Sequence, residues 1–134
     1  MMMTTQKGVT LIEMLIVIAI IGTITAIAYP SYQNHVLKSH RNKAMADLVM
    51  IQLNIEENKT KGIAYPSSGS VSASICSECD NSGERYSYTI TSTSTNYTLT
   101  ASKTSLQSAD TCANLILKST GEVTTSSNQV DCWK

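Results

Sequence analysis

The feature that most constrains this chain is an apolar run near its N-terminus, from Val9 to Ala28. Twenty helical residues rise about 30 Å, which matches the hydrocarbon core of a bilayer. The run therefore predicts a membrane-spanning helix. Its one charged residue is Glu13, and a carboxylate at membrane depth costs roughly 2.5–3.5 kcal/mol. Because a charge at this depth is costly, Glu13 is predicted to have a functional role and a specific partner.

The residues around Glu13 resemble the N-terminus of the type IV pilins. The matching stretch is GVTLIEMLIVIAIIGTITAIAYPSY, residues 8–32. In that family a short leader ends in Gly, and a Glu stands fifth in the apolar helix that follows. The resemblance implies that residues 1–8 are a leader, that prepilin peptidase cuts between Gly8 and Val9, and that Val9 is then N-methylated. Pilins usually carry Phe directly after the Gly, whereas this chain has Val9.

The same resemblance assigns roles within the helix of residues 9–29, which spans the membrane and later forms the filament core. The amine freed at Val9 and Glu13 of an adjacent subunit would neutralise each other, so that Glu13 sets the register of assembly. The alternative is that Glu13 lies at the membrane edge and reaches water. Gly22 and Pro30 mark a predicted kink, because proline lacks an N–H and clashes with the preceding turn. Alternatively, Pro30 only marks the membrane exit.

Residues 30–134 are predicted to form the globular domain. Residues 31–61 carry apolar side chains at intervals of three, four and seven, which indicates an amphipathic helix that stops near Gly62. The stripe consists of Leu37, Ala44, Leu48, Ile51 and Ile55, broadened by Met45 and Val49, with the charged residues, Asp47 among them, mostly elsewhere. Residues 62–85 are rich in Ser, Gly and Pro and are predicted to be an irregular surface loop.

Residues 86–133 predict a meander of short antiparallel strands. Tyr86, Tyr88 and Ile90 alternate with polar residues, and the alternation resumes at Tyr97 after a short turn. The apolar face of such a sheet is expected to pack on the helix stripe of residues 37–55. The predicted class is therefore α+β, the type IV pilin fold, with a long N-terminal helix on a small antiparallel sheet.

The four cysteines all follow the apolar helix. If that half is exported it meets an oxidising compartment, so two disulfides are expected. We favour Cys76–Cys79 as a local bridge and Cys112–Cys132 as a bridge that holds the C-terminus. A thioredoxin-like site would need a βαβ context, and a zinc site would need a second close pair. A long-range pairing between the two sets stays open.

Charge and motifs speak against several classes of function. The chain has 10 basic and 10 acidic residues, so bulk nucleic-acid binding has no support from net charge. His35 and His40 do not share a helix face, and neither a metal site nor a cofactor is expected. No catalytic constellation stands out, so the chain is not expected to be an enzyme. The basic residues after the helix are Arg85, Lys103, Lys118 and Lys134.

The C-terminal residues 109–133 resemble those of PilE-like minor pilins, so the expected function is a minor pilin of a type IV pilus, acting in biogenesis, adhesion or motility. The alternatives are a major pilin, a DNA-uptake minor pilin and a type II secretion pseudopilin. The DNA-uptake alternative requires the four basic residues to converge. The implied partners are other pilin subunits, prepilin peptidase and the inner-membrane assembly machinery. The implied location is the inner membrane, with a periplasmic C-terminal domain, and then the extracellular pilus.

Overall fold

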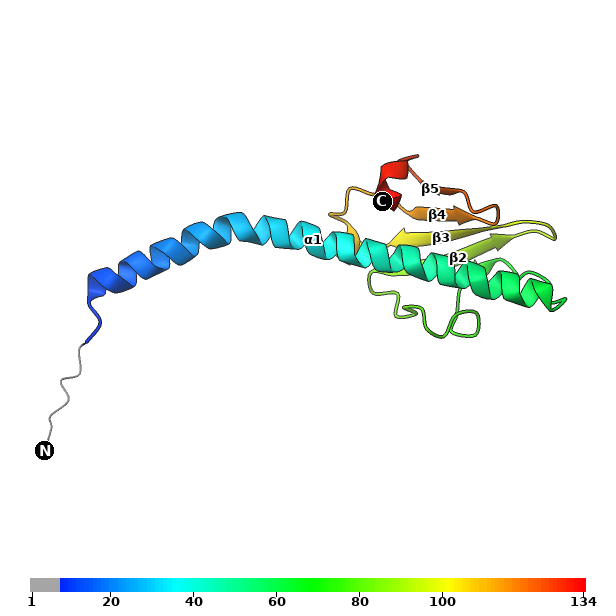
Figure 1. The fold of residues 1–134 in the computed structure, drawn as a ribbon, viewed down its shortest axis with the longest axis horizontal. Helices are drawn as coiled ribbons and strands as arrows, with labels where there is room; N and C mark the ends of the chain where they lie inside the picture. The colour runs from blue at the N-terminus through cyan, green and yellow to red at the C-terminus, as the bar shows by residue number, and fades with distance from the viewer. Residues whose placement is uncertain (1–7) are drawn as a thin grey trace, which may run out of the picture. The chain divides into compact units, whose positions relative to one another are not determined.

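The computed structural model describes residues 8–134, so the predicted leader lies outside the described residues except for Gly8. The described chain divides into a unit that ends at His35 and a second unit, Val36–Lys134. Figure 1 shows the elements in chain order. They are α1 (Leu11–Thr60), β1 (Gly69–Ser70), β2 (Tyr86–Ser92), β3 (Tyr97–Lys103), the 3-10 turn η1 (Ser105–Gln107), β4 (Leu115–Lys118), β5 (Val123–Thr125) and the 3-10 turn η2 (Val130–Trp133).

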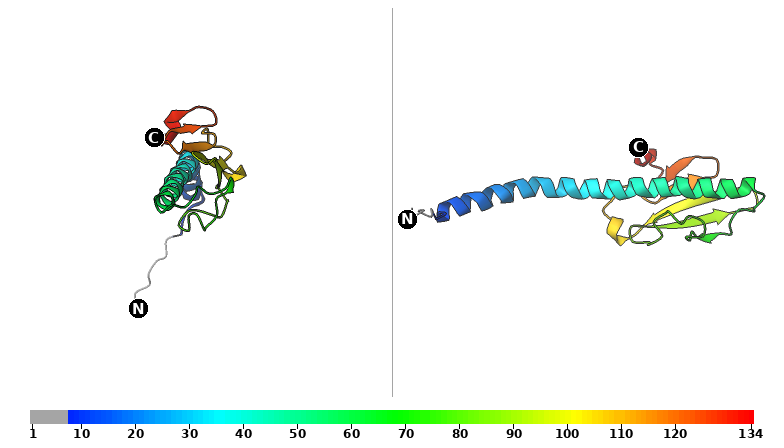
Figure 2. Two further views of the ribbon diagram at one scale, coloured as in Figure 1. Left: turned by 90° about the vertical axis from the view of Figure 1, so that its right-hand side faces the viewer. Right: turned by 60° about the horizontal axis from the view of Figure 1, so that its bottom comes forward.

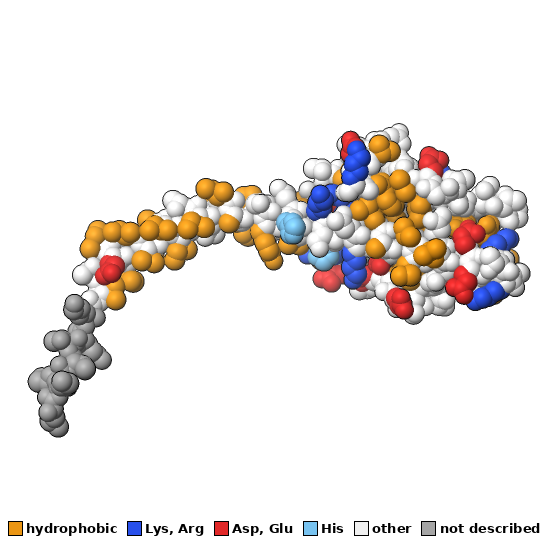
Figure 3. Space-filling model, in the orientation of Figure 1, with side chains coloured by type: hydrophobic (Ala, Val, Ile, Leu, Met, Phe, Trp, Pro, Cys, Tyr) orange, Lys and Arg blue, Asp and Glu red, His pale blue; other side chains and the backbone are white. Residues whose placement is uncertain are grey.

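The first unit is the N-terminal part of α1. By length and composition α1 is apolar enough to cross a membrane, and the most apolar window of the helix buries none of its side chains within the protein. Figure 3 shows the hydrophobic side chains, in orange, following one another along this part of the helix. The helix continues without a break through Gly22 and Pro30. A kink at those residues in an assembled filament remains a prediction.

The second unit is a five-stranded antiparallel sheet with the C-terminal part of α1 packed across one face (Figure 2). The strands follow one another in the order β1 to β5, and β2 pairs with β3 along its full length, from Tyr86 opposite Lys103 to Ser92 opposite Tyr97. The expected alternation is confirmed, because the tyrosines and aliphatic residues of β2 and β3 are buried and their Ser and Thr neighbours are not. The core lies between this face and the predicted helix stripe.

Two residues of the helix depart from the prediction. Asp47 is expected outside the apolar stripe but is 8% exposed, and its carboxylate accepts hydrogen bonds from the Tyr88 hydroxyl at 2.8 Å and the Asp80 amide at 3.1 Å. Val49 was counted with the stripe but is 44% exposed. Successive helical residues are turned by about 100°, so Val49 follows the buried Leu48 out of the interface. Helical periodicity alone cannot reveal a polar partner that another segment supplies.

The helix ends as predicted near Gly62. Gly62 has φ +83°, and its N–H donates to the Lys59 carbonyl at 3.0 Å. The N–H of Ile63 donates to the Asn58 carbonyl at 3.0 Å. These two bonds form a Schellman motif, which satisfies the last helical carbonyls and uses the left-handed conformation that glycine adopts without strain.

The segment predicted as a loop, residues 62–85, contains one short strand. In β1, Gly69 and Ser70 lie opposite Ile90 and Thr89 of β2. A strand of two residues carries too little alternation to be recognised in a sequence. The rest of the segment is irregular, and it contains the bonded pair Cys76–Cys79.

The second bonded pair, Cys112–Cys132, attaches η2 to the segment before β4. The indole N–H of Trp133 donates to the Thr124 carbonyl at 2.7 Å. This bond attaches η2 to the edge strand β5. The C-terminus is thus held covalently and by hydrogen bonding.

Candidate functional site

The first candidate site is the start of α1, where Thr10 and Glu13 cap the helix reciprocally. The Glu13 amide donates to the Thr10 hydroxyl at 3.3 Å, and the Glu13 carboxylate accepts from the Thr10 amide at 3.5 Å. This is a capping box, which satisfies amide groups that have no partner within the helix. The arrangement also places a carboxylate at the positive end of the helix dipole.

Sequence reasoning gave Glu13 a partner on another subunit and missed the partner on its own chain. The signal was present, because Thr10 and Glu13 have the Thr-x-x-Glu spacing that defines the motif. Glu13 therefore has two roles open to it, helix capping within the subunit and ion pairing with a neighbour. The capping role is observed, and the ion pair with a neighbour, which would use the same carboxylate, remains a prediction.

The second candidate site is built around the buried carboxylate of Asp110. Its side chain is 2% exposed and forms an ion pair of 2.5 Å with Arg41 of α1. It also accepts from the Gln107 side-chain amide at 3.1 Å, the Cys112 backbone amide at 2.9 Å and the Tyr86 hydroxyl at 3.4 Å. One carboxylate thus joins α1, β2, η1 and the Cys112–Cys132 disulfide.

This cluster fixes the position of residues 104–110, which we call the 104–110 turn. Besides Asp110, the turn is held through Gln107, which is fully buried and donates its side-chain N–H to the Leu37 carbonyl at 2.7 Å. These contacts attach the turn to α1 from two sides. The turn is therefore a rigid part of the second unit.

Two of the four basic residues noted in the sequence converge on the 104–110 turn. Arg85 Nη1 donates to the Leu106 carbonyl at 2.9 Å. Lys103 Nζ donates to the carbonyls of Asp110 at 2.8 Å and Ser108 at 3.4 Å. Carbonyl partners carry no net charge, so both cations keep their positive charge at this surface. Lys38 belongs to the helix turn that Gln107 contacts, and it is exposed.

The other two basic residues do not join this group. Lys118 is paired with Glu122 at 3.0 Å, and Lys134 is paired with Asp131. Their carboxylate partners offset their charges. Figure 3 shows, on its visible face, Lys and Arg side chains interspersed with Asp and Glu. Of these four residues, Arg85 and Lys103 are the two without a carboxylate partner within residues 8–134, and both contact the 104–110 turn.

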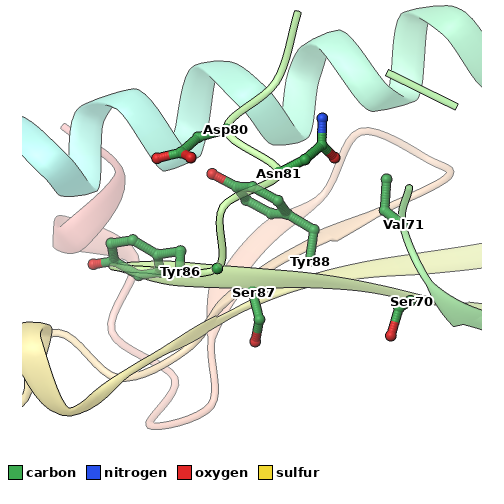
Figure 4. A pocket seen from close by; sticks show the side chains of 8 residues that line it. Ser70, Val71, Asp80, Asn81, Tyr86, Ser87 and Tyr88 are labelled. Atoms are coloured by element: carbon green, nitrogen blue, oxygen red, sulfur yellow. The ribbon is translucent and has the colours of Figure 1, made fainter. Parts of the chain in front are cut away.

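A shallow pocket of about 170 Å³ lies between β2 and the segment before it (Figure 4). The polar side chains that the loop contributes to it, Asp80 and Asn81, are hydrogen bonded within the loop. The Asn81 side-chain amide donates to the carbonyls of Cys76 and Cys79 at 2.9 Å, and Asp80 accepts from the Ser82 hydroxyl at 2.6 Å. Those Ser82 bonds lower the pKa of Asp80. The pocket thus organises the disulfide loop and offers little to a ligand.

Three tyrosines of the sheet have pKa values raised chiefly by burial. The pKa of Tyr86 is raised to about 12, and those of Tyr88 and Tyr97 are raised further. Their hydroxyls donate to the carboxylates of Asp110, Asp47 and Glu56 respectively. They act as neutral donors that join the sheet to buried or half-buried carboxylates.

Residues 8–134 contain no group of three His, Cys, Asp or Glu side chains placed to hold a metal ion. All four cysteines are in disulfides. What the described residues provide is one capped carboxylate on an apolar helix and one small cationic surface on a rigid domain. Both are features of assembly or binding.

Comparison with known protein families agrees with this arrangement. The prokaryotic N-terminal methylation motif matches residues 3–29. A family described as "Type IV minor pilin ComP, DNA uptake sequence receptor" matches residues 30–116, which is more than half of the chain. The chain belongs to this type IV pilin family. Its members are structural subunits, not enzymes, and the family resemblance and the fold expected from the sequence are both confirmed.

Curated relatives are type IV fimbrial proteins. The chain is 38% identical over 96 residues to the type IV major fimbrial protein FimA of Dichelobacter nodosus, covering 62% of this chain and 60% of that protein. It is 42% identical over 72 residues to the type IV major alpha-pilin of Moraxella bovis, covering 51% and 45%. It is 56% identical over 43 residues to the fimbrial protein EcpB of Eikenella corrodens, covering 32% and 27%. The matches thus span at most 60% of the length of these three relatives.

Proposed function

We propose that this pilin is a minor subunit of a type IV pilus that binds duplex DNA at the fibre surface and acts in DNA uptake. The observation that carries the proposal is the convergence of Arg85 and Lys103 on the 104–110 turn. The description of the family that matches residues 30–116, a DNA uptake sequence receptor, supports it further. From the sequence, the DNA-uptake alternative required four basic residues to converge; two of them, Arg85 and Lys103, do so, whereas Lys118 and Lys134 are paired with Glu122 and Asp131.

The proposed interaction is local, because the chain as a whole has no net positive charge. Phosphate contacts of a few Lys and Arg side chains supply the electrostatic part of DNA affinity, and each contact releases counterions. A surface with two or three such cations is suited to modest affinity.

Assembly is the second part of the proposal. Prepilin peptidase cuts between Gly8 and Val9, Val9 is methylated, and the new amine pairs with Glu13 of an adjacent subunit. Before assembly the helix of residues 9–29 holds the subunit in the inner membrane with the second unit in the periplasm. The support is the methylation motif over residues 3–29 and the apolar, exposed helix that carries a single carboxylate near its start.

The DNA proposal is tested with the full chain in detergent micelles. The measurement is the fluorescence anisotropy of a labelled duplex over a series of salt concentrations. Each phosphate contact contributes a slope of about −0.9 to the plot of log affinity against log salt. Arg85→Gln is expected to reduce that slope by about 0.9, whereas the matched control Lys118→Gln, which removes a cation already paired with Glu122, is expected to leave it unchanged. No binding by the unmodified chain at low salt would refute the proposal.

The assembly proposal is tested by intact-mass and N-terminal analysis of the protein from sheared filaments and from membranes. A chain that begins at methylated Val9 in the filament fraction supports it. A chain that retains residues 1–8 and is confined to the membrane contradicts it.

A second candidate function is the major pilin, because two of the relatives reported above are named as major pilins. The same preparations separate the two candidates. A major pilin would be the most abundant protein of the sheared fibres, whereas a minor pilin would be present in small amounts beside another pilin.

A further inference from the structure

The 104–110 turn displays one large apolar side chain, that of Leu106, which is 51% exposed. The cations of this surface contact the backbone at Leu106 and just after it. Arg85 donates to the carbonyl of Leu106 itself, and Lys103 donates to the carbonyls of Ser108 and Asp110. Among Arg85, Lys103, Lys118 and Lys134, the last two are paired with carboxylates. The Leu106 side chain therefore belongs to the same turn that Arg85 and Lys103 contact.

Leu106 is held at the surface by the residues around it. Its neighbour Gln107 is fully buried and hydrogen bonded to α1, so the space beneath the turn is filled. The backbone is fixed by bonds from the Gln107 amide to the Thr104 carbonyl at 3.0 Å and from the Thr104 amide to the Arg85 carbonyl at 3.0 Å. Leu106 cannot turn inward without breaking these contacts, and it has no part in the core.

We propose that Leu106 is an apolar wedge that enters the minor groove of duplex DNA and partly unstacks one base step. Arg85 and Lys103 then contact phosphates near the inserted side chain. Proteins that bend DNA combine basic side chains on the backbone with an apolar side chain inserted between bases. A duplex supplies both partners at close range, because its phosphates are charged and the faces of its bases are apolar. This inference rests on the proposed DNA-binding function and assigns its mode of contact.

The inserted side chain favours DNA that bends easily. Unstacking costs a few kcal/mol per step, and pyrimidine–purine steps deform more readily than others. The turn is rigid, so the DNA rather than the protein must change shape. The surface is thus expected to prefer duplexes with a flexible step at the insertion point.

The test compares Leu106→Ala with Val130→Ala in the full chain in detergent micelles. Val130 is a matched control, because it is an apolar residue on the other 3-10 turn and is 58% exposed. The measurements are affinity and salt slope by anisotropy, and DNA bending by energy transfer between dyes at the two duplex ends. Leu106→Ala is expected to weaken binding about tenfold and to reduce bending. The salt slope should stay unchanged because leucine carries no charge.

The outcomes separate this inference from the function on which it rests. Absence of binding by the unmodified chain removes the proposed function. Binding that depends on Arg85 but that neither Leu106→Ala nor Val130→Ala weakens overturns the wedge and leaves the proposed function standing. Equal losses in both variants also overturn it, because they indicate a general need for apolar surface. Leu106→Met, which keeps an apolar side chain of similar volume, is expected to bend DNA as the unmodified chain does, and a loss of bending in this variant would contradict the proposal.

Discussion

Replacing Asp110 by Ala is expected to destabilise the second unit by about 3–5 kcal/mol. The substitution leaves Arg41 without its ion-pair partner, and the Arg41 side chain is only 13% exposed. It also removes one of the two acceptors of the Gln107 side-chain amide and the acceptor of the Cys112 backbone amide, and both residues are buried. A small domain is stable by about 5–15 kcal/mol, so the loss is a large fraction of the total.

The converse substitution, Arg41→Met, is expected to cost less, about 1–3 kcal/mol. The Asp110 carboxylate would then keep three of its four donors, the Gln107 side-chain amide, the Cys112 backbone amide and the Tyr86 hydroxyl. The two costs are therefore unequal although both variants lose the same ion pair. The difference arises because Asp110 is the hydrogen-bond partner that the described residues give the Arg41 side chain, whereas the Asp110 carboxylate keeps other donors when Arg41 is replaced.

Urea unfolding of the full chain in nonionic detergent, followed by fluorescence, measures both values. Trp133 is the single tryptophan and is half-buried in η2, so it reports on the second unit. Val130→Ala, which removes two exposed methyl groups, serves as a control with little expected effect. The reasoning is refuted if Asp110→Ala costs less than Arg41→Met, or if either cost is no larger than that of the control.

Three further predictions concern the same unit. Replacing Cys112 and Cys132 by Ser is expected to lower the free energy of unfolding by about 3 kcal/mol, measured by the same urea titration, because the bridge closes a loop of about twenty residues. Burial raises the pKa of Tyr86 from 10.0 to about 12. The stability that the neutral Tyr86 hydroxyl contributes is therefore complete below pH 10 and is lost as the pH rises toward 12. The absorbance of the ionised phenol is expected to appear together with unfolding. Gly62→Ala should cost about 1 kcal/mol in thermal unfolding because φ is +83° there, and no change in the melting temperature would contradict the strained-backbone argument.

Local sequence patterns were enough to predict the framework of this pilin. The apolar run from Val9 to Ala28 predicted the membrane-competent helix, and the spacing of apolar residues predicted the helix stripe that covers the sheet. The alternation after Tyr86 predicted which side of β2 and of β3 is buried. These features are readable because helices and strands repeat with fixed periods, so that neighbours in sequence reveal which side faces the core. The capping box of Thr10 and Glu13 is equally local and could have been found by its spacing.

Only the tertiary structure decided which partners the polar residues contact. Arg41 and Asp110 are 69 positions apart in the sequence and meet as a buried pair. Asp47 is buried because Tyr88 and Asp80 approach it from other segments, and Arg85 and Lys103 form one surface because antiparallel pairing brings the ends of β2 and β3 together. Hydrogen bonds and charges act at short range in space whatever the separation along the chain. The candidate DNA surface could therefore be recognised only in the folded structure and not in the sequence.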